Sequence, residues 1–205
     1  GELAQMFRDE LELDLELTVI PVQGWTREMV FDQTQLLWIN PSPNMRSLTQ
    51  AFLYPGVGLL ETTNLSVGRG TDTPFEVVGA PWINALELAQ NLNASDLAGV
   101  RFVPIRFTPD ASKFEGQRCD GVNVIVTERE SMDPLTVGLT IAVTLRRLYP
   151  NDWDTDSLNR LLASQKTFTG ILRGLSVNEL VSGYQQELDA FKLRRAKYLL
   201  YPEPR

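Results

Sequence analysis

The spacing of apolar residues in the first eighty positions predicts short alternating helices and strands. Residues 2–13 have the amphipathic pattern of a helix, with Leu3, Met6, Phe7 and Leu11 on one stripe. A β-branched run at 17–22 predicts a strand, and 25–44 is irregular. A short helix at 46–53, ended by Pro55-Gly56, precedes a second predicted strand at 57–60. This order is typical of an α/β layer. Two strands do not make a stable parallel sheet, so we interpret this part as the second half of a larger domain.

The pattern changes after Trp82. Residues 84–93 predict a helix, and the apolar runs 100–108 and 122–127 predict an antiparallel pair of strands. Asp133-Pro134 is an N-cap followed by proline at the first helical position, so a helix should run from there to Leu148. Further helices are predicted at 154–165 and 168–172, and Ser176 with Glu179 forms a capping box that opens the last helix.

These elements predict an α/β fold with a boundary near residue 82. Residues 1–82 would be the C-terminal portion of a parallel-sheet domain, and residues 83–205 a smaller α+β domain.

The composition is that of an ordinary globular protein, and it excludes several kinds of catalytic and metal site. The 205 residues are 43% hydrophobic and 22% charged, with a net charge of −7. This acidic balance argues against binding to nucleic acid. Because there is no histidine and one cysteine, Ser-His-Asp triads, Cys-His pairs and His-based zinc sites are excluded within this sequence. Neither an apolar run long enough for a membrane span nor a basic N-terminal signal is present in it.

The polar loop at 61–72 is the main candidate for function, because long loops in compact domains commonly serve binding sites. Glu61 and Asp72 bracket it, and paired carboxylates are the usual equipment of glycosidases. The alternative is that Glu61 caps backbone amides and Asp72 belongs to a turn.

Arg69 lies between Gly68 and Gly70, which allow the unusual backbone dihedrals that could aim a guanidinium at a carboxylate or phosphate. It could equally be an ordinary exposed loop arginine. Trp82 could stack on a sugar ring or fill the core. The runs GVGLLE and GRGTD lack the spacing of dinucleotide or P-loop motifs.

Several segments together resemble the NamZ-type exo-β-N-acetylmuramidase family. They are WTREMVFDQT at 25–34, WINPSPNMRSL at 38–48, LLETTNLSVGRGTDTPFEVVGAPW at 59–82, CDGVNVIVTERESMDPLTVGLTIAVTLRRLYP at 119–150 and the terminal RAKYLLY. They follow the family's order and cover nearly the whole chain. The resemblance implies a Rossmann-like domain followed by a smaller α+β auxiliary domain. It also implies release of N-acetylmuramic acid from the non-reducing ends of peptidoglycan fragments.

Family members are roughly twice as long, so the resemblance implies that this chain begins midway through the Rossmann-like domain and needs the upstream half as its partner. Glu61 and Asp72 would be catalytic, unless the principal carboxylate lies upstream. The lactyl carboxylate of the sugar gives Arg69 an anionic target, with Asn64, Ser66, Thr71 and Trp82 as further substrate-binding residues. The resemblance implies no metal or cofactor. It implies a periplasmic or secreted location and leaves a cytoplasmic one open. The alternative is a non-catalytic carbohydrate-binding or assembly fragment.

Overall fold

A computed structural model describes residues 1–201 as a mixed α/β protein with a small antiparallel sheet. Its contacts divide the chain into two units. Unit 1 is Gly1–Leu37 with Tyr184–Arg205, and unit 2 is Trp38–Gly183.

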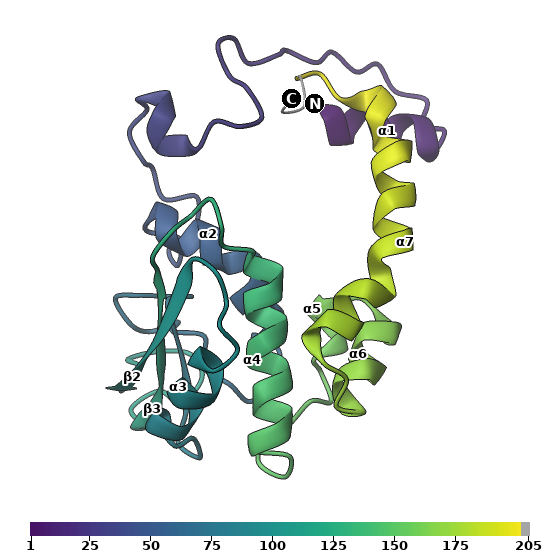
Figure 1. The fold of residues 1–205 in the computed structure, drawn as a ribbon. Coiled ribbons are helices and arrows are strands. Elements are labelled where there is room, and N and C mark those ends of the chain that lie inside the picture. Colours follow the sequence, from purple (N-terminus) through teal and green to yellow (C-terminus); the bar gives the residue numbers. More distant parts are fainter. Residues whose placement is uncertain (202–205) are drawn as a thin grey trace. The chain divides into compact units, whose positions relative to one another are not determined.

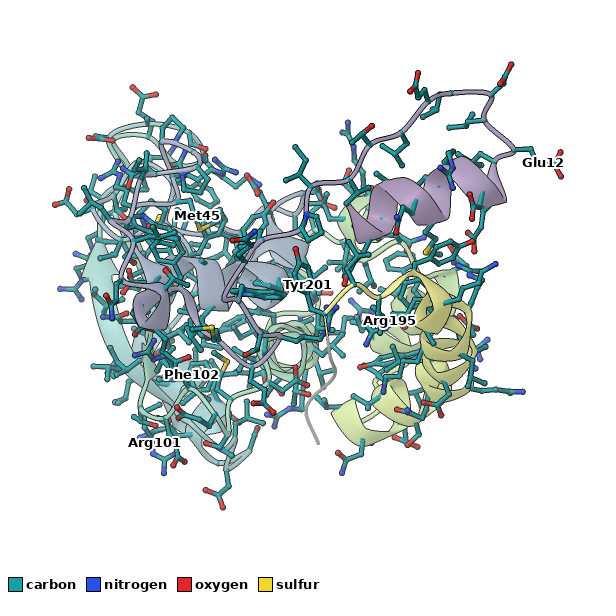
Figure 2. All side chains as sticks on the ribbon, turned by 90° about the horizontal axis from the view of Figure 1, so that it is seen from above. Glu12, Met45, Arg101, Phe102, Arg195 and Tyr201 are labelled. Carbon is teal, nitrogen blue, oxygen red and sulfur yellow. The ribbon has the colours of Figure 1, made fainter. Side chains whose placement is uncertain are left out.

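The sheet of unit 2 has three strands in the order β1-β3-β2. They are β1 at Val77–Ala80, β2 at Val100–Phe107 and β3 at Cys119–Val126, and both pairings are antiparallel. The two longer strands, β2 and β3, lie side by side in Figure 1. The predicted antiparallel pair is therefore confirmed, and Phe102 lies opposite Val124 in its register. On β2, Phe102 is buried whereas its neighbour Arg101 extends to the surface (Figure 2). The first strand, β1, was not predicted.

The sheet crosses the predicted domain boundary, because β1 precedes residue 82 and the other two strands follow it. The predicted division at this residue stays a prediction. The parallel sheet expected for residues 1–82 is not present among residues 1–201, where the strands of the sheet are antiparallel.

Helix α4, at Pro134–Leu148, is the central helix of unit 2. Its start is confirmed, because the Asp133 side chain accepts a hydrogen bond from the Leu135 backbone at 3.1 Å. Val137, Ile141 and Leu145 are buried among its neighbours. These are α2 at Leu48–Val57, α3 at Ala85–Asn93, α6 at Gln165–Leu172 and the 3-10 turn η2 at Gly58–Leu60.

The predicted strand at 57–60 is wrong, because α2 continues past Pro55 and ends in η2. Packing explains the difference. A Cβ on Gly56 would lie 1.7 Å from the Pro134 carbonyl oxygen, so the glycine lets α2 cross α4 at close range. The Pro55-Gly56 pair is a helix-ending signal in isolation. Here the buried crossing outweighs that local preference.

The remaining helices of unit 2 are α5 at Asn159–Leu162 and the start of α7 at Val177–Arg195. The helix predicted at 154–165 is thus limited to α5, because Ala163 takes a left-handed φ of 51° and Ser164 caps α6. The capping box is confirmed: the Ser176 backbone donates to Glu179 Oε2 at 2.8 Å, and the Glu179 backbone donates to Ser176 Oγ at 3.3 Å.

Unit 1 joins the beginning of the chain to its last described residues. It contains α1 at Glu2–Glu10, the 3-10 turn η1 at Phe31–Thr34, the rest of α7 and the turn η3 at Ala196–Tyr198. Glu2 accepts from the Leu200 backbone at 2.8 Å and pairs with Arg27 at 2.5 Å. Trp25 packs edge-on against Tyr201.

The strand predicted at 17–22 is wrong for this structure. Its apolar side chains find no strand to pair with among residues 1–201, and Ile20 is 86% exposed. The helix predicted at 2–13 is present as α1 but ends at Glu10, before Leu11 of the predicted stripe, and Met6 is the buried member of that stripe.

Candidate functional site

Glu61 lies at the C-terminal end of the helical run formed by α2 and η2. The turn that follows is fixed from inside the unit. The Thr63 hydroxyl donates to the Leu60 carbonyl at 2.8 Å and accepts from Trp153 Nε1 at 3.1 Å. A helix end, rather than the predicted strand end, therefore presents Glu61.

Arg69 follows eight residues later and returns to Glu61. Gly68 and Gly70 have φ values of 82° and 76°, which confirms that the glycines supply the left-handed backbone on both sides of Arg69. Its Nε forms an ion pair with Glu61 Oε1, and its guanidinium carbon lies 5.3 Å from the centre of the Phe75 ring. Phe75 is buried and packs edge-on against Tyr54.

This arrangement leaves the terminal nitrogens of Arg69 available. Within residues 1–201 its interactions are the Glu61 ion pair through Nε and the contact with Phe75. The two side chains are 30% and 27% exposed for Arg69 and Glu61, so the pair borders solvent. A guanidinium restrained at Nε with open terminal nitrogens can bind an anion in bidentate fashion.

Asp72 is separate from this pair. Its side chain is fully exposed, and its Oδ1 lies 3.8 Å from Arg46 Nη1. The two predicted catalytic carboxylates therefore interact with different arginines.

Three of the predicted substrate-binding residues form hydrogen bonds that shape the loop. Asn64 donates to the Asp152 carbonyl at 2.7 Å and accepts from the Asp154 backbone at 2.8 Å. Ser66 is buried and accepts from the Gly68 backbone at 3.3 Å. Thr71 donates to the Gly68 carbonyl at 2.7 Å. Their predicted contacts with substrate stay predictions.

Trp82 lies just before α3, where it packs edge-on against Tyr149 with ring centres 5.4 Å apart. Its indole nitrogen is buried and has no hydrogen-bond partner among the described residues. Beside it, residues of the first turn of α3 help to line a pocket of about 530 Å³ with Pro104, Ile105, Arg106 and Asp120.

Unit 1 contains two further pockets. One of about 620 Å³ is lined by residues between Val22 and Leu36, and one of about 320 Å³ lies around Glu2, Trp25 and Tyr201. None of these three pockets is lined by residues 61–72. Among residues 1–201 no group of His, Cys, Asp and Glu side chains is arranged to hold a metal ion, and no helix is long and apolar enough for a membrane crossing.

Sequence reasoning missed Lys113. This residue lies on the loop between β2 and β3, and its Nζ donates to the Glu61 carbonyl at 3.0 Å and to the Thr63 carbonyl. Burial lowers the pKa of Lys113, opposed by the charges of Glu61 and Asp154. No local pattern marks it, because its partners are about fifty positions away in the sequence.

The fold of this chain is similar to the folds of two DUF1343 family proteins whose structures are solved. It is similar to a DUF1343 family protein from Bacteroides fragilis NCTC 9343, with a TM-score of 0.80 and 29% identity over 98% of this chain and 55% of that one. A second DUF1343 family protein from the same organism matches with a TM-score of 0.72 and 26% identity over 100% of this chain and 55% of that one.

Sequence comparison identifies the family. The model described as "Exo-beta-N-acetylmuramidase NamZ, C-terminal" matches residues 52–201, and the corresponding N-terminal model matches residues 1–49. The chain belongs to this NamZ family, as the sequence resemblance predicted. It is 42% identical to "Peptidoglycan beta-N-acetylmuramidase NamZ" of Bacillus subtilis (strain 168), over 98% of this chain and 49% of that protein. The chain thus spans about half the length of the curated relative that it matches.

Proposed function

We propose that this chain supplies part of the active-site cleft of a glycoside hydrolase. The enzyme would release N-acetylmuramic acid from the non-reducing ends of peptidoglycan fragments, in the turnover of the bacterial cell wall. The observation that carries the proposal is the Glu61–Arg69 pair, in which the terminal nitrogens of Arg69 have no partner within residues 1–201. Membership of the NamZ family supports it.

The chemistry of the sugar fits this pair. N-acetylmuramic acid differs from N-acetylglucosamine by a lactyl carboxylate, which is a bidentate partner for the free nitrogens of Arg69. Glycosidases usually work with two carboxyl groups, and Glu61 and Asp72 are our candidates for them. Asn64, Ser66, Thr71 and Trp82 are the proposed neighbours of the sugar's hydroxyl and N-acetyl groups.

Because the chain spans half of its curated relative, the activity is proposed for a longer assembly. In it, residues 1–82 would join an upstream half to form the Rossmann-like domain, and residues 83–205 would form the auxiliary domain. A principal carboxylate in the upstream half fits the proposal as well. The expected location is the periplasm or the cell exterior, where peptidoglycan fragments arise.

A cleavage assay tests the proposal. The chain would be assayed alone and fused to the N-terminal half of the Bacillus subtilis relative, on chromogenic β-glycosides of N-acetylmuramic acid and N-acetylglucosamine. We expect the fusion to cleave the muramic glycoside alone. Arg69→Met should reduce this cleavage far more than Arg101→Met, because Arg101 donates to the neighbouring Val100 carbonyl on β2 and contacts none of the proposed site residues.

The alternative class of function has its own outcome. If no form cleaves the glycoside but the chain binds N-acetylmuramic acid, the protein is a non-catalytic carbohydrate-binding fragment. Absence of both cleavage and binding would contradict the proposal altogether.

A further inference from the structure

Lys113 reaches the site from a different part of the chain. Its Nζ donates to the carbonyls of Glu61 and Thr63 at the end of the α2–η2 helical run. The last carbonyls of a helix carry partial negative charge and lack partners inside the helix. The Glu61 carbonyl belongs to the C-cap of this run and the Thr63 carbonyl to the turn after it, and an ammonium with three donors can bind both oxygens at once. Lys113 thereby ties the turn that carries Glu61 to the loop between β2 and β3.

The backbone conformation beside Lys113 supports a specific structural role for this residue. Ser112 and Phe114, on either side of Lys113, have left-handed φ values of 69° and 63°. Such values are uncommon for residues other than glycine, asparagine and aspartate, and they persist where surrounding contacts enforce them. The surrounding contacts therefore hold the backbone in an unfavourable conformation on both sides of the lysine.

A second contact brings the same loop to the other half of the pair. The Asp110 backbone donates to the Gly70 carbonyl at 2.7 Å, one residue after Arg69. A Cβ on Gly70 would lie 2.2 Å from the Ala111 carbonyl oxygen, so the two backbones are in close contact. The loop between β2 and β3 consequently holds the chain beside Glu61 through Lys113 and beside Arg69 through Asp110 and Ala111.

We propose that Lys113 is a positioning residue: it fixes the turn on which Glu61 pairs with Arg69, and so sets where the free nitrogens of Arg69 point. The relevance of this role to catalysis rests on the function proposed above. The positioning of Glu61 and Arg69 by Lys113 does not depend on that function, because it can be measured without substrate.

The test follows the Nε–H group of Arg69 by NMR in the 205-residue chain. We would measure its hydrogen exchange in the unchanged protein and in Lys113→Met, Lys113→Gln and Lys113→Arg. The matched control is Lys166→Met, because Lys166 also donates to a backbone carbonyl, that of Gly183, within the same unit. Melting temperatures measured alongside separate positioning from stability.

We expect exchange to accelerate about tenfold in Lys113→Met, as for loss of one hydrogen bond to a charged group. Lys113→Arg should restore slow exchange, since it keeps a cationic donor, and Lys166→Met should leave exchange unchanged. If Lys113→Met fails to fold, Lys113→Gln provides the same comparison with a shorter neutral donor.

Two results would overturn the inference. In one, the Lys113 variants melt at lower temperature while exchange at Arg69 stays as it was, which makes Lys113 a stabilising residue only. In the other, Lys166→Met accelerates exchange equally, which indicates general loosening. Accelerated exchange specific to Lys113, in a protein without glycosidase activity or sugar binding, would retain the positioning role and remove the proposed function.

Discussion

The orientation of Arg69 results from three restraints at the scale of single residues. Glycines with left-handed φ flank it, Glu61 pairs with its Nε, and Phe75 lies under the guanidinium. Charge alone would be satisfied by lysine. The planar fork, with one nitrogen engaged and two free, is what a carboxylate ligand requires.

We expect Arg69→Lys to weaken binding of N-acetylmuramic acid about ten- to a hundredfold, because lysine has no second parallel donor and loses the Nε contact with Glu61. Isothermal titration would measure the affinity, with Arg101→Lys on β2 as the control that should change little. Unchanged affinity would argue against carboxylate binding by Arg69. An equal loss for N-acetylglucosamine, which lacks the lactyl group, would give Arg69 a structural task instead.

Cys119 should be chemically inert in the folded protein. It is completely buried on β3, and burial, assisted by the charge of Asp120, raises the pKa of its thiol to about 11. At pH 8 the thiol is therefore protonated and inaccessible, whereas the thiolate is the reactive form. A thiol reagent should label the protein only after denaturation. Stoichiometric labelling of the native chain would show that β3 opens readily.

Among the elements, the crossing of α2 and α4 depends on the absence of side chains. A Cβ at Gly138 would lie 2.4 Å from the Gly56 carbonyl oxygen. We expect Gly138→Ala to lower the free energy of unfolding by about 1–3 kcal/mol, as overpacking does. Urea unfolding would measure it. In Gly183→Ala, where the nearest atom is Lys166 Cε at 3.6 Å, helix propensity should instead add about 0.5–1 kcal/mol.

The β2–β3 pair carries a pH-dependent contribution. Arg106 donates to Asp120 Oδ1 at 2.8 Å, and this hydrogen bond lowers the pKa of Asp120 below its ordinary 3.8. The folded state therefore binds the proton less readily than the unfolded state, and the stabilisation is present at neutral pH and lost as the pH falls below that value. Asp120→Asn should cost less than about 1 kcal/mol at pH 7, since Arg106 is exposed, and less again at a pH below the folded-state pKa of Asp120. Equal losses at both pH values would contradict an electrostatic origin.

Local signals identified the elements whose ends are set by neighbouring residues. Asp133 and the Ser176–Glu179 box begin their helices as predicted, because a cap is a contact within one turn. The β2–β3 pair followed from two apolar runs. By contrast, Pro55-Gly56 continues a helix because of α4, a contact about eighty positions away that no local pattern records.

In the candidate site too, local features were predicted and contacts between distant residues were not. The sequence pointed to Arg69 and its glycines, since their spacing is local. It did not indicate Lys113, Asp152 or Trp153, which meet the loop from distant positions. It also did not predict β1, because that strand is four residues long and is stabilised by pairing with β3.

For the whole molecule, the apolar side chains that remain exposed are the informative feature. Ile20 and Leu37 of unit 1 are 86% and 85% exposed, and many of the other large exposed apolar residues also belong to this unit. Where exposed apolar side chains adjoin one another, they mark an interaction site or an aggregation hazard. In the longer assembly proposed above, the upstream half would cover these side chains.

We therefore expect the 205-residue chain, studied alone, to dimerise or aggregate through residues of unit 1, because removing exposed apolar area from water favours association. Size-exclusion chromatography would report the association, and hydrogen exchange would locate it. Residues 17–22, which pair with no strand within 1–201, should exchange fast in the chain alone and slowly once the N-terminal half of the Bacillus subtilis relative is fused to it. Residues 100–107 and 119–126, which pair with each other as β2 and β3, should be protected in both forms and serve as the internal control. A monomeric chain in which residues 17–22 are already protected would mean that the first unit is complete by itself, and the need for an upstream half would have to be abandoned.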